Sequence, residues 1–224
     1  MDARLKISIV VPCLDEAGSI AETLRSLSLL RERGHEVIVV DGGSRDATEA
    51  LARPHCDRFL QAPRGRALQM NAGAAAASGE ALVFLHADTL LPTDADRLVE
   101  EALRQRCWGR FDVRIDGPHP MLAVVAAAMN ARSRLTGIAT GDQAIFVRRD
   151  AFPGFPAIAL MEDVAFSKAM KRLGRPACLR ARVRTSGRRW ERRGVLRTIA
   201  LMWGLRLAFF LGASPESLRR RYEA

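Results

Sequence analysis

The residues of this chain best suited to chemistry are aspartates that follow short apolar runs. Asp88 follows the run Ala81–Leu85, and Asp41 follows the run Val37–Val40. Such runs fit buried central strands, and open α/β sheets bind ligands at the carboxyl ends of their strands. A carboxylate at a strand exit can hold a metal ion or a ribose. A helix cap or a loop aspartate is the alternative, and the stretch around Asp88 does not by itself decide between them.

Charged residues also gather where helices are expected to begin. Glu162 and Asp163 open one predicted helix, and Arg64 and Arg66 precede another that runs to Ala77. Free N–H groups at a helix N-terminus suit phosphate, and arginine adds charged donors. Capping remains the alternative for the acidic pair, because acidic residues stabilise a helix N-terminus. A solvated basic loop remains the alternative for the arginines.

The first half of the chain alternates strand-like and helix-like stretches. Predicted strands lie at residues 7–11, 37–40, 58–61 and 81–85. A capping box of Ser19 and Glu22 predicts one helix start, and a further helix is predicted from Thr93 to Gln105. Because strands joined by helical crossovers run parallel, this order predicts an α/β fold, a Rossmann-like three-layer sandwich with a mainly parallel central sheet.

From Trp108 onward the alternation loosens. Strand patterns lie at residues 111–115, 144–147 and 177–183, and helical patterns at residues 121–134, 161–173 and 195–211. With 224 residues, 48% of them hydrophobic, the chain is long enough to bury one large core. We therefore expect a single domain over residues 1–224.

The composition narrows the class of partner. Lys and Arg number 35 against 25 Asp and Glu, and the resulting charge of +10 favours nucleic acid, an anionic membrane surface or a phosphorylated small molecule. The four cysteines are far apart and form no C-x-x-C pair, so neither a zinc site nor a disulfide framework is indicated. No secretory signal pattern is visible, and a reducing cytoplasm is the simplest expectation.

The apolar run Val195–Leu211 near the C-terminus contains Arg197 and Arg206. Each arginine near a bilayer centre would cost roughly 3 kcal/mol, so we do not expect a transmembrane helix. A helix packed on the domain is expected instead. An interfacial helix remains open because Trp203 lies near arginines that would meet anionic lipid. Packing against a second subunit in a homodimer also remains open.

Several separated motifs resemble those of one known family. In chain order they are Val10-Val-Pro12 with Asp15-Glu16, Val40-Asp41-Gly-Gly-Ser44, Arg64-Gly-Arg66, Gln69-Met-Asn71-Ala-Gly73, His86-Ala-Asp88 and Glu162-Asp163. In this order they resemble the motifs of family 2 glycosyltransferases of the GT-A fold, and the resemblance covers nearly the whole chain. It implies a nucleotide-binding half over residues 1–115, an acceptor and catalytic half over residues 116–193, and a C-terminal helical segment over residues 194–224.

The resemblance also implies a nucleotide-diphosphate sugar as donor. Asp41 would contact its base, and the segment with Arg66 would lie along its diphosphate. The implied donor site comprises Pro12, Asp15, Glu16, Asp41, Gly42, Arg66, Asn71, His86 and Asp88. His86-Ala-Asp88 stands at the D-x-D metal motif, with His86 in place of the first acid, so Asp88 is the expected ligand of Mg²⁺ or Mn²⁺. His86 itself would be an outer donor, a ribose contact or a structural residue.

The expected reaction is inverting transfer of a sugar to an acceptor hydroxyl. By resemblance Asp163 would be the general base, Glu162 would orient the acceptor, and Arg189 would add donors to the diphosphate. The acceptor side would be formed by Gly141, Asp142, Gln143 and Trp190, with core packing as the alternative for the tryptophan. Ser186 replaces the glutamine of the Q-x-x-R-W motif found in processive relatives, which disfavours processive polymerisation.

The small size and the motifs HADT and GDQ most resemble a bacterial subgroup associated with radical-SAM/selenodomain genes and arsenosugar biosynthesis. The expected acceptor is a small molecule or a lipid-linked molecule, and nucleic acid is not an expected partner. We expect a cytoplasmic protein, with the inner face of the membrane as an alternative location. A non-catalytic, basic module for membrane surfaces or nucleic acid is the alternative function, and His86 in the metal motif keeps it open.

Overall fold

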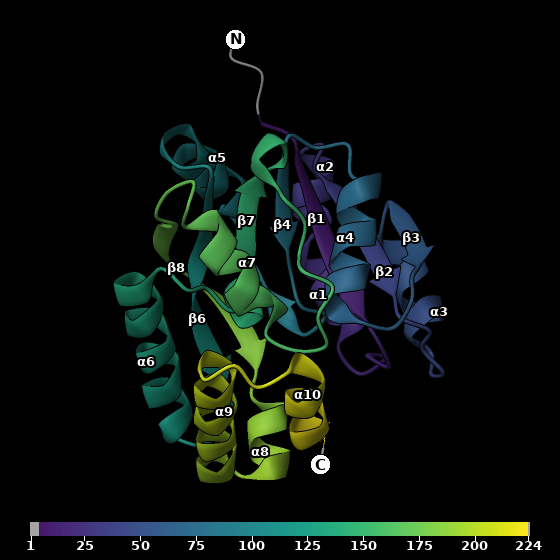
Figure 1. Cartoon of the computed structure of the whole chain (residues 1–224). Helices are drawn as coiled ribbons and strands as arrows, with labels where there is room; N and C mark the ends of the chain where they lie inside the picture. The colour runs from purple at the N-terminus through teal and green to yellow at the C-terminus, as the bar shows by residue number, and fades with distance from the viewer. Residues whose placement is uncertain (1–4, 224) are drawn as a thin grey trace.

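An eight-stranded sheet runs through the centre of the molecule, with helices on both faces (Figure 1). The computed structural model describes residues 5–223, apart from the side chains of Arg189, Arg192 and Glu223. The strands are β1 (Ile7–Cys13), β2 (Glu36–Asp41), β3 (Arg58–Gln61), β4 (Ala81–Phe84), β5 (Thr89–Leu90), β6 (Trp108–Asp116), β7 (Ile145–Arg148) and β8 (Ala177–Ser186). The helices are α1 (Ile20–Ser26), α2 (Ser28–Glu32), α3 (Thr48–Ala52), α4 (Arg66–Ala76), α5 (Ala95–Gln105), α6 (Met121–Thr136), α7 (Glu162–Met170), α8 (Arg188–Arg193), α9 (Val195–Phe210) and α10 (Pro215–Glu223). Short 3-10 helices lie between them at η1 (Arg53–His55), η2 (Gly141–Gln143) and η3 (Arg149–Ala151).

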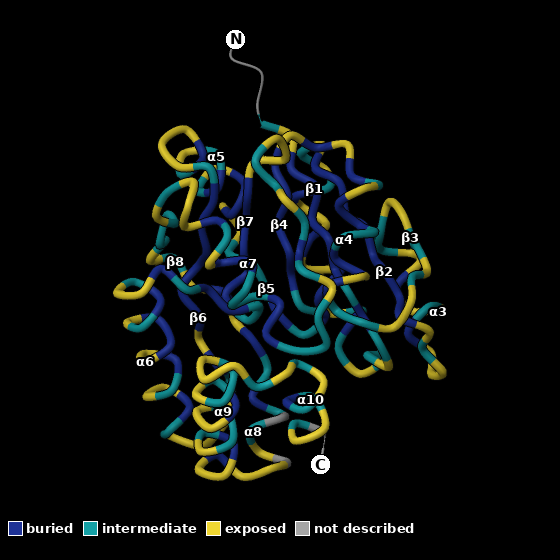
Figure 2. The backbone as a smooth tube through the Cα atoms, in the orientation of Figure 1, coloured by how far each residue is buried: buried dark blue, intermediate teal, exposed yellow. Residues whose placement is uncertain are grey.

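The amino-terminal part of the sheet is parallel, as predicted. β1 pairs in parallel with β2 and β4, and β2 pairs in parallel with β3. β1 and β2 are buried along almost their whole length, which explains their uninterrupted apolar sequences (Figure 2). The register places Cys13 beside Asp41, so the loops that follow β1 and β2 leave the sheet at the same edge.

The sheet as a whole is mixed, and the prediction of a mainly parallel sheet was wrong. In the order β3-β2-β1-β4-β7-β6-β8-β5, β7 runs antiparallel to both of its neighbours and β5 runs antiparallel to β8. The reason lies in η2, which contacts His86 just beyond the end of β4. The chain enters β7 from that end and must run back along β4, with Ile145 opposite Phe84.

Helices enclose two apolar cores, one on each face of the sheet. α1 and α5 supply Leu24 and Val99 to the larger core, and α4 and α7 supply Met70 and Phe166 to the other. α4 lies very close to the strands because it carries Gly73. A Cβ atom at that position would lie 2.4 Å from Val10 Cγ1.

The predicted capping box at Ser19 does not form. Its hydroxyl donates instead to the carboxylate of Glu16 at 2.9 Å, and no side-chain cap is present at α1. The stretch expected as one helix divides into α1 and α2. The basic stretch before residue 194, for which no helix was predicted, contains the short helix α8.

The C-terminal segment packs on the domain, as expected. Leu205 of α9 and Leu218 of α10 are buried together with Met161, which directly precedes α7. Among residues 5–223, no helix combines the length and the apolar character needed to span a bilayer. α9 is therefore a packed helix whose inner face supports the start of α7.

Candidate active site

A cleft at the carboxyl ends of β1 and β4 collects residues that are far apart in the sequence. It is lined, among others, by Pro12, Arg66, His86, Gly141, Glu162 and Asp163. All six were predicted to belong to the site. A larger hollow at the opposite end of the sheet, beside Gly79 and Arg148, contains none of the predicted residues. We identify the candidate site by the charged residues that line the smaller cleft, and not by the size of the hollow.

Asp163 is held in a fixed position at the start of α7. Its Oδ2 accepts a hydrogen bond from the Gly141 N–H at 3.0 Å, and its Oδ1 accepts one from the Val164 N–H at 2.7 Å. Met161 precedes the helix with a φ of 69°, a left-handed conformation that is uncommon for residues other than glycine. This turn aims the first residues of α7 toward the cleft.

Glu162 is buried beside Asp163 and is only 4% exposed. Its Oε1 lies 3.2 Å from Arg66 Nη1, without the alignment of a hydrogen bond. Burial raises the pKa of Glu162, while Arg66 opposes the rise and Asp163 adds to it. Burial lowers the pKa of Arg66, but the three carboxylates of Glu162, Asp163 and Asp142 outweigh this and raise it.

His86 turns toward η2. Its Nδ1 lies 3.2 Å from Asp142 Oδ1. A Cβ atom on Gly141 would lie 2.4 Å from His86 Nε2, so only glycine allows this close approach. Within the described part of the chain, His86 Nε2 is buried without a hydrogen-bond partner. The histidine that replaces the first acid of the metal motif thus contacts η2.

Asp41 organises its own loop. Its Oδ2 accepts hydrogen bonds from the Gly43 and Ser44 N–H groups at 3.0 and 2.9 Å, and its Oδ1 accepts one from the Ser44 hydroxyl. The residue is only 2% exposed. Burial raises the pKa of Cys13, and the neighbouring Asp41 carboxylate raises it further. The hydrogen bonds of Asp41 therefore hold the loop after β2 in its conformation.

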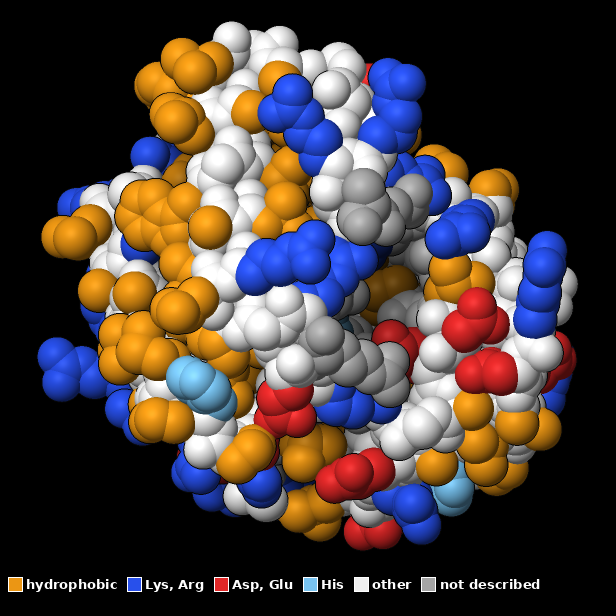
Figure 3. Space-filling view, turned by 90° about the horizontal axis from the view of Figure 1, so that it is seen from below, with side chains coloured by type: hydrophobic (Ala, Val, Ile, Leu, Met, Phe, Trp, Pro, Cys, Tyr) orange, Lys and Arg blue, Asp and Glu red, His pale blue; other side chains and the backbone are white. Residues whose placement is uncertain are grey.

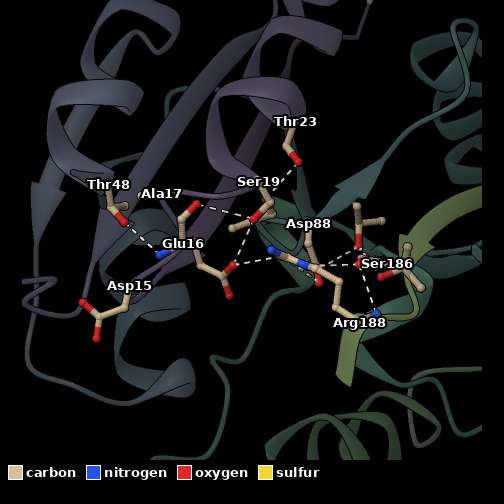
Figure 4. Close-up of polar contacts among 12 residues, drawn as sticks. Asp15, Glu16, Ala17, Ser19, Thr23, Thr48, Asp88, Ser186 and Arg188 are labelled. Atoms are coloured by element: carbon tan, nitrogen blue, oxygen red, sulfur yellow. Dashed lines mark hydrogen bonds and ion pairs between the residues drawn. The ribbon is translucent and has the colours of Figure 1, made fainter. Parts of the chain in front are cut away.

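Asp15 and Glu16 point in different directions from the loop after β1 (Figure 4). Asp15 Oδ1 accepts a hydrogen bond from the Arg45 N–H at 2.8 Å, which ties the loop to the one after β2. Glu16 Oε2 instead lies 3.5 Å from Nη2 of Arg188, across the site. Asp15 therefore stabilises the loop, whereas Glu16 contacts a residue of the site.

Arg188 lies between two carboxylates on the donor side (Figure 4). Besides Glu16, its Nη2 lies 3.9 Å from Asp88 Oδ2, and its Nε donates to the Ser186 hydroxyl at 3.1 Å. The Asp88 side chain is 27% exposed. A partly exposed carboxylate beside an arginine suits a diphosphate and a divalent cation together.

The carboxylate of Asp88 fits a hard divalent cation only if other oxygen ligands come from outside the described residues. Among the described residues, no group of three His, Cys, Asp or Glu side chains could hold a metal ion. Mg²⁺ is commonly bound by one or two carboxylates together with substrate phosphates and water. Asp88 supplies such a carboxylate, so a metal here would depend on the bound diphosphate.

Comparison with known proteins decides the family. The model of the family described as glycosyl transferase family 2 matches residues 8–152. The chain belongs to glycosyl transferase family 2. Over 95 residues it is 33% identical to the poly-beta-1,6-N-acetyl-D-glucosamine synthase of Staphylococcus epidermidis, a match that covers 40% of this chain and 23% of the synthase. Over 104 residues it is 32% identical to an uncharacterized glycosyltransferase of Nostoc sp., covering 43% of this chain and 32% of that protein.

Solved structures of glycosyltransferases share the fold. A mannosyltransferase from Pyrobaculum calidifontis, in complex with GDP-Man and Mn²⁺, has a TM-score of 0.63 at 22% identity and covers 82% of this chain and 57% of its own. Glucosyl-3-phosphoglycerate synthase from Mycobacterium tuberculosis, in complex with Mn²⁺, UDP and phosphoglyceric acid, has a TM-score of 0.60 at 20% identity, covering 80% and 68%. These neighbours establish the GT-A fold of this family 2 glycosyltransferase.

Some predicted site residues of this glycosyltransferase have structural contacts instead. The amide of Asn71 exchanges two hydrogen bonds of 2.8 Å with the Phe155 backbone, and Gln143 Nε2 bonds Asn130 and Ser133 of α6 at 3.3 and 3.1 Å. Trp190 packs against the larger apolar core. The side chain of Arg189 lies outside the described residues.

Residues that were not predicted to belong to the site also shape it, among them Gln69 of the Gln69–Gly73 motif. Gln69 Nε2 donates to the carbonyl oxygens of Cys13 and Val40 at 2.7 and 2.9 Å, and it packs against Gly42, where a Cβ atom would lie 3.1 Å away. Arg188 was passed over for its neighbour Arg189. Arg188 stands at the start of α8, directly after Gly187, and its Nη2 lies 3.9 Å from Asp88 Oδ2.

Proposed function

We propose that this glycosyltransferase is a metal-dependent, inverting enzyme that moves a sugar from a nucleotide-diphosphate sugar to an acceptor hydroxyl. One observation carries the proposal: Asp163, fixed by Gly141, shares a cleft with Arg66 and His86 at the strand ends where donors bind. In this proposal the nucleotide half comprises residues 1–115, and the acceptor half comprises residues 116–193.

Asp163 is proposed as the general base. As the acceptor oxygen attacks the anomeric carbon, its proton passes to a carboxylate oxygen of Asp163, and the bond from that carbon to the diphosphate oxygen breaks. The Gly141 N–H, which donates to Oδ2 at 3.0 Å, orients the carboxylate. A positioned general base typically contributes ~10²–10⁴-fold.

The neighbours of Asp163 would balance the negative charge around it and keep it aligned. Arg66 faces Glu162 and is also under the influence of Asp163 and Asp142, so one guanidinium offsets a cluster of carboxylates. Glu162 Oε1 is buried without a hydrogen-bond partner among the described residues. A donor on the acceptor or the sugar would satisfy that oxygen, which agrees with an orienting role.

The donor side would hold the diphosphate between Asp88 and Arg188. A divalent ion on Asp88, Mg²⁺ or Mn²⁺, would supply Lewis-acid stabilisation of the leaving diphosphate when bound. The Arg188 guanidinium, which lies near Glu16 and Asp88, would instead donate hydrogen bonds to the diphosphate oxygens. Asp41 would act through the loop that it holds in shape.

The narrower assignments remain part of this proposal. They comprise the radical-SAM/selenodomain-associated subgroup, a small-molecule or lipid-linked acceptor, and a cytoplasmic location. Sequence motifs support them, and the first two would be tested by an acceptor search once the donor is known.

Peripheral contact with an anionic membrane is a second proposal. The outer face of α9 exposes Leu196, Trp203, Leu207 and Phe210, with exposed fractions of 60–78%. Their spacing forms one helical stripe, and exposed Arg193 and Arg197 lie at its start. Binding to phosphatidylglycerol vesicles but not to phosphatidylcholine vesicles, lost in Trp203→Gln/Phe210→Gln, would support it. Equal binding by the variant would remove it.

The deciding experiment is a calorimetric titration with UDP, GDP and dTDP, each with Mn²⁺ and with EDTA. We expect one nucleotide to bind with micromolar affinity in the presence of metal and much more weakly with EDTA. Absence of binding for all three would favour the alternative of a non-catalytic basic module.

A further inference from the structure

Two arginines from distant parts of the chain, Arg132 and Arg206, interact electrostatically with each other and with Asp142 and Asp163. Arg132 lies on α6, between Asn130 and Ser133, whose side chains bond Gln143 of η2. Arg206 lies on α9, next to Leu205, which is buried against Met161 at the start of α7. η2 carries Asp142, and α7 carries Asp163, so α6 and α9 support the two segments that form this side of the cleft.

Both guanidinium groups contain buried nitrogen atoms that form no hydrogen bond with another described residue. Nε and Nη2 of Arg132 and Nε of Arg206 are buried without a hydrogen bond. Both residues are half-buried as a whole, so the remainder of each side chain reaches the surface. Figure 3 shows Lys and Arg side chains gathered beside a hollow on this face, with acidic side chains across from them.

The electrostatics of the pair are unfavourable without a ligand. Burial and the positive charge of Arg206 together lower the pKa of Arg132 to about 10, against the opposing effect of the Asp163 and Asp142 carboxylates. Burial also lowers the pKa of Arg206, opposed by the carboxylates of Asp163 and Asp142. Desolvated like charges destabilise a fold unless an opposite charge compensates them. An arrangement of this kind indicates a binding site for an anion.

We propose that Arg132 and Arg206 bind an anionic group, a phosphate or a carboxylate, carried by the acceptor. The inference rests on the proposed function and adds the chemical class of the acceptor. The acceptor, rather than the donor, is indicated because the two arginines lie with Asp142 and Asp163, whereas Arg188 serves the donor side beside Asp88. The anion would fix the acceptor while its hydroxyl meets Asp163.

Glycerol 3-phosphate is a suitable probe because it carries both a hydroxyl and a phosphate. The protein is first saturated with its nucleotide and Mg²⁺, and glycerol 3-phosphate or neutral glycerol is then titrated at constant ionic strength. We expect glycerol 3-phosphate to bind and glycerol not to bind. In Arg132→Gln/Arg206→Gln we expect at least tenfold weaker binding, while Arg172→Gln, which changes an exposed arginine just after α7, binds like the wild type.

The source of the phosphate is tested with vesicles. Phosphatidylglycerol vesicles that bind the wild type but not the double variant would support the same anion site with a lipid phosphate as ligand. Equal binding of glycerol 3-phosphate and of vesicles by wild type and double variant would overturn the inference. So would no binding of either probe to a wild-type protein that still binds its nucleotide, whereas loss of nucleotide binding itself would count against the proposed function.

The stability of the double variant guards against misfolding as an explanation. Removing two unpaired, partly buried charges should leave Tm without ligand equal to or above that of the wild type. Glycerol 3-phosphate should raise Tm of the wild type and not that of the variant. A variant with a strongly lowered Tm would show that the arginines stabilise the fold, and would overturn the anion site.

Discussion

The donor and acceptor halves of the cleft differ in how their buried polar groups are satisfied. On the donor side, Asp41 and Gln69 bond the backbone of the loops that they shape. On the acceptor side the described residues leave buried atoms unpaired. Of seven such side-chain atoms, five belong to His86, Arg132, Glu162 and Arg206.

This difference separates a preformed part of the site from a part that a ligand completes. Buried polar atoms without partners are rare because each one destabilises the fold. In the proposed function, a bound acceptor would supply the missing partners of these atoms. The donor loops, in contrast, hold their shape through their own hydrogen bonds.

The largest expected effect comes from Asp163→Asn. The change keeps the size of the side chain and an acceptor for the Gly141 N–H but removes the base, so we expect kcat to fall by about 10²–10⁴-fold. Nucleotide affinity, measured by calorimetry, should stay within about twofold, since the base acts on the acceptor. If kcat and nucleotide affinity fell by the same factor, Asp163 would act on the donor, and the proposed separation of the cleft into a donor side and an acceptor side would be wrong.

Asp88→Ala tests the donor side. Because Asp88 would be the only protein carboxylate on the metal, we expect metal-dependent nucleotide affinity to fall by at least the ~10–100-fold typical of lost outer partners. Asp94→Ala, which removes an exposed carboxylate at the start of α5, is the matched control. If Mn²⁺ enhances nucleotide binding as strongly in Asp88→Ala as in the wild type, Asp88 is not the metal ligand.

The sequence allowed the positions of most strands and of the central acidic residues to be predicted. Buried strands have apolar runs, and residues at the ends of parallel neighbours must meet, which brings Asp88 and the loop of Glu16 to the same edge. Strand direction after residue 108 could not be predicted, because it depends on where η2 lies. That position follows from contacts of His86 and Gly141, which no periodicity records.

Side-chain direction was the second limit. Asn71 and Gln143 occupy motif positions but bond the backbone of Phe155 and the residues of α6. A motif fixes the order of residues along the chain, whereas a one-residue shift at the start of a helix turns a side chain by about 100°. Arg188 lies 3.9 Å from Asp88 and was not predicted, whereas the prediction for Arg189 stays untested because its side chain is outside the described residues.

Glu36, within residues 1–115, has a buried carboxylate whose hydrogen bonds are all made within the protein, and their contribution to stability can be measured. It accepts hydrogen bonds from Ser8 and from the backbone and side chain of Ser78. Burial alone would raise the pKa of Glu36, but these bonds and Arg58 hold it below its usual value. We expect Glu36→Gln to lower the free energy of unfolding by about 1–2 kcal/mol at pH 7.

The pH dependence of that loss follows from its sign. A lowered pKa stabilises the fold above the unfolded value of about 4.3, and the contribution disappears as pH falls through the folded pKa. The difference between wild type and Glu36→Gln in denaturant unfolding should therefore be full at pH 7 and shrink below about pH 4. Glu80→Gln, at a neighbouring exposed position, should show no such trend. A constant difference across this range would show that Glu36 is not stabilised as a carboxylate.

Glu162→Gln should have the smallest effect, but of opposite sign. Burial raises the pKa of Glu162, so its ionised form destabilises the fold above the folded pKa, and this penalty is absent below about pH 4. Arg66 still interacts with the carboxylates of Asp163 and Asp142 when Glu162 carries no charge, so the substitution does not leave Arg66 without an opposite charge. We therefore expect Tm of Glu162→Gln to exceed that of the wild type at pH 7 and to equal it near pH 4. A lower Tm at pH 7 would mean that the pair with Arg66 stabilises the fold, and the acceptor half would then be as satisfied as the donor half.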